Sequence, residues 1–66
     1  MNIVLNGKPR ELTKPVSVAR LLEIEGVVGK RIAVEVNEEI VPRGEHGQYE
    51  LHEDDRVEIV RAIGGG

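Results

Sequence analysis

The chain has 66 residues, a mass of 7.3 kDa and a formal net charge of −3, with nine Lys and Arg against twelve Asp and Glu. A chain of this length forms one small domain and leaves little room for a deep catalytic pocket, which typically needs ~300–1,000 Å³. The negative charge argues against a non-specific nucleic-acid binder. The chain has no cysteine, no signal-peptide pattern and no apolar run near the ~20 residues of a membrane span. These features predict a soluble, cytoplasmic protein.

Alternating apolar residues open the chain and predict a strand over residues 1–6. The following Asn6-Gly7 pair tolerates positive φ at both positions, which predicts a two-residue hairpin turn. The partner strand is expected over residues 8–13. It contains Pro9 and places basic side chains on its inner face, so we expect it at an edge of the sheet.

The segment after Pro15 predicts the only helix. Ser17 is a good N-cap, and Val16 and Leu21 occupy the two positions of a hydrophobic staple. The apolar spacing then predicts a helix over residues 18–25 with one apolar stripe. Gly26 is expected to end it.

The second half of the chain predicts three more strands. Residues 31–36 alternate cleanly, with Ile32, Val34 and Val36 on one face. Asn37-Glu38 predicts a turn into a short strand over residues 39–42, and residues 43–48 predict a loop or a single helical turn. The last strand is expected over residues 56–61.

These elements follow the order β-β-α-β-β-β and predict an α+β fold. Proline is confined to edges, ends or bulges of strands, so the two strands that contain Pro9 and Pro42 are expected at the edges. A mixed sheet in the order 2-1-5-3-4, with the helix on one face, satisfies this constraint. The sequence therefore predicts a ubiquitin-like β-grasp domain over residues 1–63, followed by a glycine tail over residues 64–66.

Side chains suited to catalysis are scarce, so we expect a protein that is not an enzyme and binds no metal or cofactor itself. His46 and His52 lie six residues apart and are expected to be solvated loop residues. Ser17 is explained by helix capping. The acidic run 53–55 lacks the oxygen-ligand spacing of a calcium loop and is expected to be a turn.

The glycine run Gly64-Gly65-Gly66 is the one feature that suggests chemistry. An unstructured end and a cloning remnant are two plain interpretations of it. The third is that the carboxylate of Gly66 is the functional group, because glycines pass through a narrow channel and residues 62–66 span at most ~16–18 Å. An ionised carboxylate needs activation, for example as an acyl-adenylate. An ATP-using partner would supply it, because the chain has no phosphate-binding loop.

Four segments together resemble the ThiS family of sulfur carriers: residues 3–12, residues 17–22, residues 33–43 except 38 and 39, and residues 55–66. Two turns depart from the family pattern, since Glu38 and Asp54 stand where glycine is common. We expect both residues to adopt backbone geometry that glycine accepts more easily. His46 stands near a position that is often aromatic in the family.

The resemblance implies a cycle on Gly66. A ThiF-like adenylating enzyme uses MgATP to form the acyl-adenylate, sulfur from a cysteine desulfurase gives a thiocarboxylate, and the thiazole synthase ThiG accepts that sulfur during thiamine biosynthesis. Docking to these partners is assigned to the open face of the sheet and the base of the tail. By strand parity and position, these docking residues are Val4, Ala33, Glu58, Val60, Ala62 and Ile63.

Other functions share the glycine tail. The runners-up within the same chemistry are sulfur carriers for molybdopterin synthesis or tRNA thiolation. A ubiquitin-like protein modifier would instead be joined to lysines of its targets. A regulatory β-grasp module is a third class, and it would function without Gly65 and Gly66.

Overall fold

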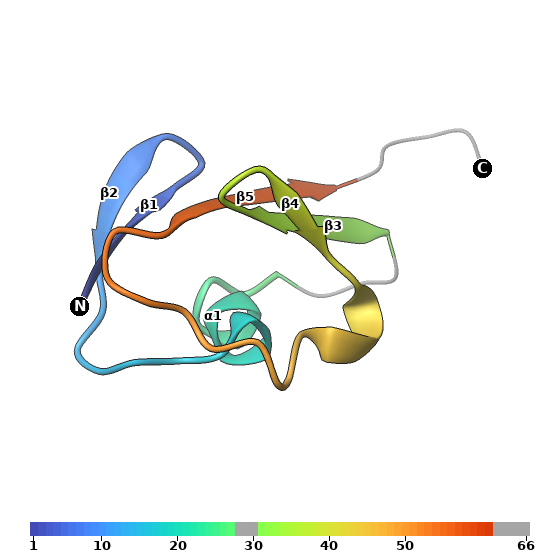
Figure 1. The fold of residues 1–66 in the computed structure, drawn as a ribbon, viewed down its shortest axis with the longest axis horizontal. Helices are drawn as coiled ribbons and strands as arrows, with labels where there is room; N and C mark the ends of the chain where they lie inside the picture. The colour runs from blue at the N-terminus through green and yellow to red at the C-terminus, as the bar shows by residue number, and fades with distance from the viewer. Residues whose placement is uncertain (28–30, 62–66) are drawn as a thin grey trace.

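The computed structural model describes residues 1–27 and 31–61, and within them it contains five strands, one α-helix and one 3-10 turn (Figure 1). The strands form a single sheet in the order β2-β1-β5-β3-β4, with α1 packed on one face. This confirms the predicted α+β fold and strand order. The elements are β1 (Asn2–Leu5), β2 (Lys8–Glu11), α1 (Val18–Ile24), β3 (Ile32–Val36), β4 (Glu39–Val41), η1 (Arg43–Glu45) and β5 (Arg56–Arg61).

The strand pairing places β5 in the middle of the sheet. β5 runs parallel to β1 and antiparallel to β3, while β1–β2 and β3–β4 are antiparallel pairs. Pro9 lies in the edge strand β2, and Pro42 follows the edge strand β4. Neither proline therefore removes a donor from an interior ladder, as the sequence predicted.

Two hairpins turn through residues with positive φ. Asn6 and Gly7 have φ of 50° and 81°, and Asn37 and Glu38 have φ of 53° and 71°. Paired positive values are typical of the two-residue turns whose twist matches that of the flanking strands. Asp54 also has a positive φ of 68°. Glu38 and Asp54 thus adopt the glycine-favoured geometry that the sequence predicted.

The ends of α1 are held by specific bonds. The backbone N–H of Arg20 donates to Ser17 Oγ at 3.1 Å, so Ser17 is the N-cap. At the other end, Gly26 has a φ of 70°, and the N–H of Val27 donates to the carbonyl of Leu22 at 2.9 Å. The helix proper ends at Ile24, with Glu25 as its C-cap, one residue before the predicted end.

The core lies between α1 and the sheet and is almost entirely aliphatic. Val18 and Leu21 of the helix and Val34 of β3 are fully buried. Complete burial of such side chains stabilises a fold by about 1.5–3 kcal/mol each. The buried apolar residues are Ile3, Leu12, Val16, Val18, Leu21, Val34, Val36, Val41, Leu51 and Val57.

Several strands are shorter at their ends than the sequence predicted. β2 ends at Glu11 rather than residue 13, although the N–H of Leu12 still donates to the carbonyl of Met1 at 2.7 Å. β4 ends at Val41, because Pro42 begins the 3-10 turn. That turn occupies residues 43–45 of the segment predicted as a loop or helical turn.

The prediction that His46 is a solvated loop residue is wrong. Its side chain is buried, with a relative exposure of 8%, and Nε2 lies 3.0 Å from the carbonyl oxygen of Val41. A carbonyl oxygen only accepts, so Nε2 carries the hydrogen. The physical reason is η1, which turns the chain back beneath the sheet, so that the carbonyl of His46 also accepts from Ala19 N–H at 2.9 Å. His52 is exposed, as predicted.

Candidate functional site

The open face of the sheet, opposite α1, carries four of the residues assigned to docking. Ala33 lies directly opposite Val60, and Val4 lies opposite Arg56, two residues along the strand from Glu58. Val60 is 51% exposed, Ala33 and Glu58 are exposed, and Val4 is half-buried. The structure therefore brings these four side chains to one accessible face.

Ile40 belongs to the same face and was missed in the sequence analysis. It is 70% exposed, and it lies opposite Glu35 on the neighbouring strand. The two-residue turn at Asn37 and Glu38 fixes this register, and an odd step from Val41 then points Ile40 away from the core. The alternation around the turn was the signal that could have identified it. Ile40, Ala33 and Val60 give the open face three exposed apolar side chains.

Charged residues border this apolar group. Glu35 and Glu58 lie directly opposite each other on β3 and β5, a like-charge arrangement that opposes strand pairing. They line a shallow hollow together with Asn37, Glu38 and Arg56. Within residues 1–27 and 31–61 the ion pairs are Arg10–Glu25 and Arg20–Glu23, both outside this hollow. The open face thus combines apolar side chains with carboxylates that form no ion pair among the described residues.

The strand that precedes the tail is held firmly on both sides. On one side, β5 is paired with β3 as far as Ile32 and Arg61. On the other, β1 stops at Leu5, and the side chain of Asn6 continues its role, since Asn6 Oδ1 accepts from the N–H of Ile59 at 2.7 Å. β5 is therefore bonded on both sides as far as Ile59, and to β3 alone from there to Arg61.

The tail residues themselves lie outside the described residues. This applies to Ala62 and Ile63, which were assigned to docking, and to Gly64, Gly65 and Gly66, which were assigned to the chemistry. Their roles stay predictions. So does the division into a domain over residues 1–63 and a tail over residues 64–66.

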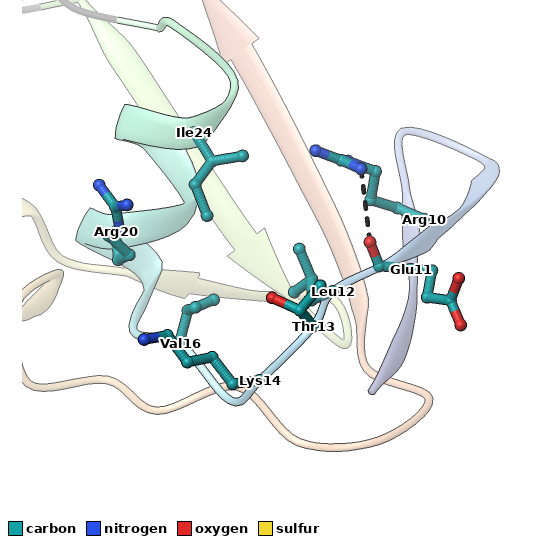
Figure 2. Close-up of a pocket in the computed structure, with 8 residues that line it drawn as sticks. All are labelled: Arg10, Glu11, Leu12, Thr13, Lys14, Val16, Arg20 and Ile24. Carbon is teal, nitrogen blue, oxygen red and sulfur yellow. Dashed lines mark hydrogen bonds between the residues drawn. The ribbon is translucent and has the colours of Figure 1, made fainter.

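The hollow in Figure 2 is smaller than a typical small-molecule site. It lies between the β2–α1 connection and the helix, with the apolar side chains of Leu12, Val16 and Ile24 among its lining residues. Its volume is about 200 Å³, below the ~300–1,000 Å³ of typical ligand pockets. Two of its cations are already engaged, since Arg10 pairs with Glu25 at 2.9 Å and Arg20 pairs with Glu23 at 3.0 Å.

The described part of the chain shows neither a metal cluster nor a membrane-spanning helix. No group of three or more His, Cys, Asp or Glu side chains gathers there in a way that could hold a metal ion. No helix among the same residues has the length and apolar character needed to cross a membrane.

Comparison with known proteins points to one family. The model of the ThiS family matches residues 3–66. The crystal structure of the thiamine biosynthesis protein ThiS from Geobacter metallireducens superposes with a TM-score of 0.87 at 30% identity, over all of both chains. A thiazole synthase from Paramagnetospirillum magneticum is 41% identical over 66 residues, which is all of this chain but only 20% of that protein. The protein ycf40 of Pyropia yezoensis is 32% identical, and this chain covers 93% of its length.

Proposed function

Because the chain belongs to the ThiS family of small, non-catalytic sulfur carriers of thiamine biosynthesis, we propose that it carries sulfur as a thiocarboxylate on Gly66. The observation that carries this proposal is the extension of the family match through residue 66, at the end of the segment that follows β5. The sequence prediction of a ThiS-family β-grasp protein is confirmed. The chemistry on Gly66 is our proposal.

The proposed reaction begins at the carboxylate of Gly66, which is ionised at neutral pH and is a poor electrophile. One carboxylate oxygen attacks the α-phosphate of MgATP held by a ThiF-like enzyme, and pyrophosphate leaves. The acyl-adenylate then has a good leaving group, and the outer sulfur of a persulfide formed by a cysteine desulfurase displaces AMP to give an acyl disulfide. A thiol reductant cleaves the S–S bond of this acyl disulfide, which leaves the thiocarboxylate on Gly66 and a disulfide between the reductant and the cysteine that carried the persulfide. The resulting thiocarboxylate delivers its sulfur to a thiazole synthase of the ThiG type.

The body of the protein supports a carrier role because it supplies position rather than catalytic groups. Glycine lacks a Cβ, so a Gly-Gly-Gly backbone fits a channel that would exclude other residues. Residues 62–66 span at most ~16–18 Å, which sets the depth that the carboxylate reaches beyond Arg61. MgATP is used by the partner, and no cofactor is assigned to this chain.

We assign partner docking to the open face of the sheet around Ala33, Val60 and Ile40. Exposed apolar residues with charged neighbours are typical of a docking surface for another protein. A domain 41% identical to this chain lies within a longer thiazole synthase of Paramagnetospirillum magneticum. That arrangement supports ThiG as one partner, and we propose that these encounters take place in the cytoplasm.

Intact-mass spectrometry tests the carrier chemistry. Incubation with a ThiF-like enzyme, MgATP, a cysteine desulfurase, cysteine and a thiol reductant should raise the mass by about 16 Da, as sulfur replaces oxygen. Oxidation of Met1 gives the same increment, so the product must also react with an alkylating reagent selective for thioacids. Gly66→Val is the matched control, expected to fold normally and to remain unmodified. A wild-type chain that no ThiF-like enzyme adenylates would refute the proposal.

The same samples separate the alternative functions. Transfer of sulfur to a molybdopterin precursor or to tRNA, rather than to a thiazole synthase, would reassign the acceptor while keeping the chemistry. Stable conjugates of high molecular weight would instead favour a protein modifier. Full function after deletion of Gly65 and Gly66 would favour a regulatory module.

A further inference from the structure

Arginines gather at the end of the sheet where β5 stops. Arg61 is the last residue of β5 and pairs with Ile32, so Arg31, which immediately precedes β3, lies at the same end. β4 runs antiparallel to β3 and ends at Val41, and η1 begins there with Arg43. Figure 1 shows the end of β5, the start of β3 and η1 on one side of the molecule. All three arginines are exposed, and we call them the arginine end of the sheet.

The opposite end of the sheet is acidic. The turn between β3 and β4 and the turn that leads into β5 contribute five carboxylates, with Arg56 as the nearest cation in sequence. At the arginine end, η1 contributes one carboxylate, Glu45. The charges of this net acidic chain are thus separated along the strand direction, with the positive end beside the tail. The five carboxylates belong to Glu38, Glu39, Glu53, Asp54 and Asp55.

The side chain of Arg61 is not engaged by the described residues. Among residues 1–27 and 31–61, no side-chain hydrogen bond or ion pair engages Arg61. Glu25 lines the same hollow as Arg61, but its carboxylate bonds Arg10 at 2.9 Å. An exposed arginine fork is well suited to a carboxylate of another molecule.

The length of the tail indicates which anion the arginines meet. Gly66 lies five residues beyond Arg61, at most ~16–18 Å away along the chain. When Gly66 reaches a nucleotide inside a partner, Arg61 stays near the outer opening of the channel. The anion is therefore a carboxylate on the partner's surface rather than a phosphate of the nucleotide.

Building on the carrier function proposed above, we propose that Arg31, Arg43 and Arg61 dock onto an acidic protein surface that surrounds the channel of the adenylating partner. The separated charges turn the approaching chain so that its tail end meets that surface first. Attraction of this kind raises association rates by about 10–10³-fold and weakens as salt shortens the Debye length below ~10 Å. It acts on the encounter and leaves the chemical step unchanged.

A pair of triple variants tests this proposal. The first combines Arg31→Ala, Arg43→Ala and Arg61→Ala. The matched control combines Lys8→Ala, Lys14→Ala and Arg20→Ala, which removes the same charge from exposed positions elsewhere. Each is assayed by pyrophosphate release with a purified ThiF-like enzyme and MgATP, at about 50 mM and 500 mM salt.

The first variant should lose about tenfold or more in kcat/KM at low salt, with kcat at saturating carrier unchanged and a smaller loss at high salt. The control should stay within about twofold of wild type. Because Arg31 and Arg43 make further contacts, the single changes Arg61→Ala and Arg61→Glu serve as variants that preserve the fold. Arg61→Glu should be the slower of the two.

Three outcomes would overturn the proposal. Equal losses in both triple variants would show that only net charge matters. A loss confined to kcat would place the arginines at the nucleotide. Unchanged kinetics in every arginine variant, with normal adenylation of wild type, would remove the docking role and leave the carrier function intact. Failure of the wild-type chain to be adenylated would refute the carrier function itself.

Discussion

Asn6 performs two tasks at the point where β1 ends, and substitutions separate them. Its backbone has a φ of 50°, and its Oδ1 accepts from the N–H of Ile59 at 2.7 Å. The backbone N–H of Asn6 also donates to the carbonyl of Val57 at 2.8 Å. In a continued parallel ladder the next acceptor for Ile59 would be a backbone carbonyl of β1. The amide side chain of Asn6 takes that place because the chain has already turned away.

The expected free energies follow from these two tasks. Asn6→Gly keeps the positive φ and loses the acceptor, so it should destabilise the fold by about 1 kcal/mol. Asn6→Ala also loses the acceptor, and alanine tolerates positive φ less well than asparagine or glycine, for a total of about 2 kcal/mol. Asn6→Asp keeps an acceptor oxygen and tolerates the conformation. It should stay within about 0.5 kcal/mol of wild type.

Urea unfolding followed by far-UV circular dichroism is the suitable assay, because Tyr49 is the only aromatic residue and the chain has no Trp. With a slope of about 1 kcal/mol/M, the Gly variant should unfold about 1 M earlier than wild type, and the Ala variant about 2 M earlier. Identical midpoints for wild type and Asn6→Gly would refute the role of the amide acceptor. Identical midpoints for the Gly and Ala variants would refute the role of positive φ.

Three further substitutions test separate features. Glu38→Gly should stabilise the fold by about 0.5–1 kcal/mol in the same urea assay. Glycine relieves the backbone strain at a φ of 71°, and this gain exceeds the entropy that glycine adds to the unfolded chain. Destabilisation would contradict this reasoning. His46→Leu should lower the free energy of unfolding by about 1–3 kcal/mol, because the carbonyl of Val41 loses its hydrogen-bond partner at 3.0 Å in a buried site. A urea midpoint equal to that of wild type would show that water replaces the bond. Val60→Asp should leave thermal unfolding unchanged, because Val60 is 51% exposed on the open face. It should lower kcat/KM for adenylation by about tenfold or more if that face docks the partner. An unchanged rate in a folded variant would show that the face takes no part in docking.

Local signals in the sequence were enough to predict most of the fold. The Asn6-Gly7 turn, the Ser17 cap and the alternation of residues 31–36 each act within a few neighbouring residues, and the structure confirms all three. The two edge prolines then ordered the strands, because proline cannot donate to an interior ladder. Even the departures at Glu38 and Asp54 followed from the geometry of the turns.

The features that the sequence did not predict depend on contacts between distant segments. The burial of His46 requires η1 to fold back under the sheet, toward the start of α1. The place of Ile40 on the open face requires the β3–β4 register, and the gathering of arginines beside Arg61 requires three strands in register at once. Periodicity identifies the face of one strand, while these properties belong to the assembled sheet.

The position of β5 determines when the sheet can assemble. β5 is the last of the described strands in the chain, yet it lies between β1 and β3. Before it joins, the earlier strands form two separate hairpins with no backbone ladder between them. A nascent chain therefore completes its sheet only after residue 61 has left the ribosome. Any adenylating enzyme that recognises the assembled sheet would in this way ignore unfinished or misfolded copies.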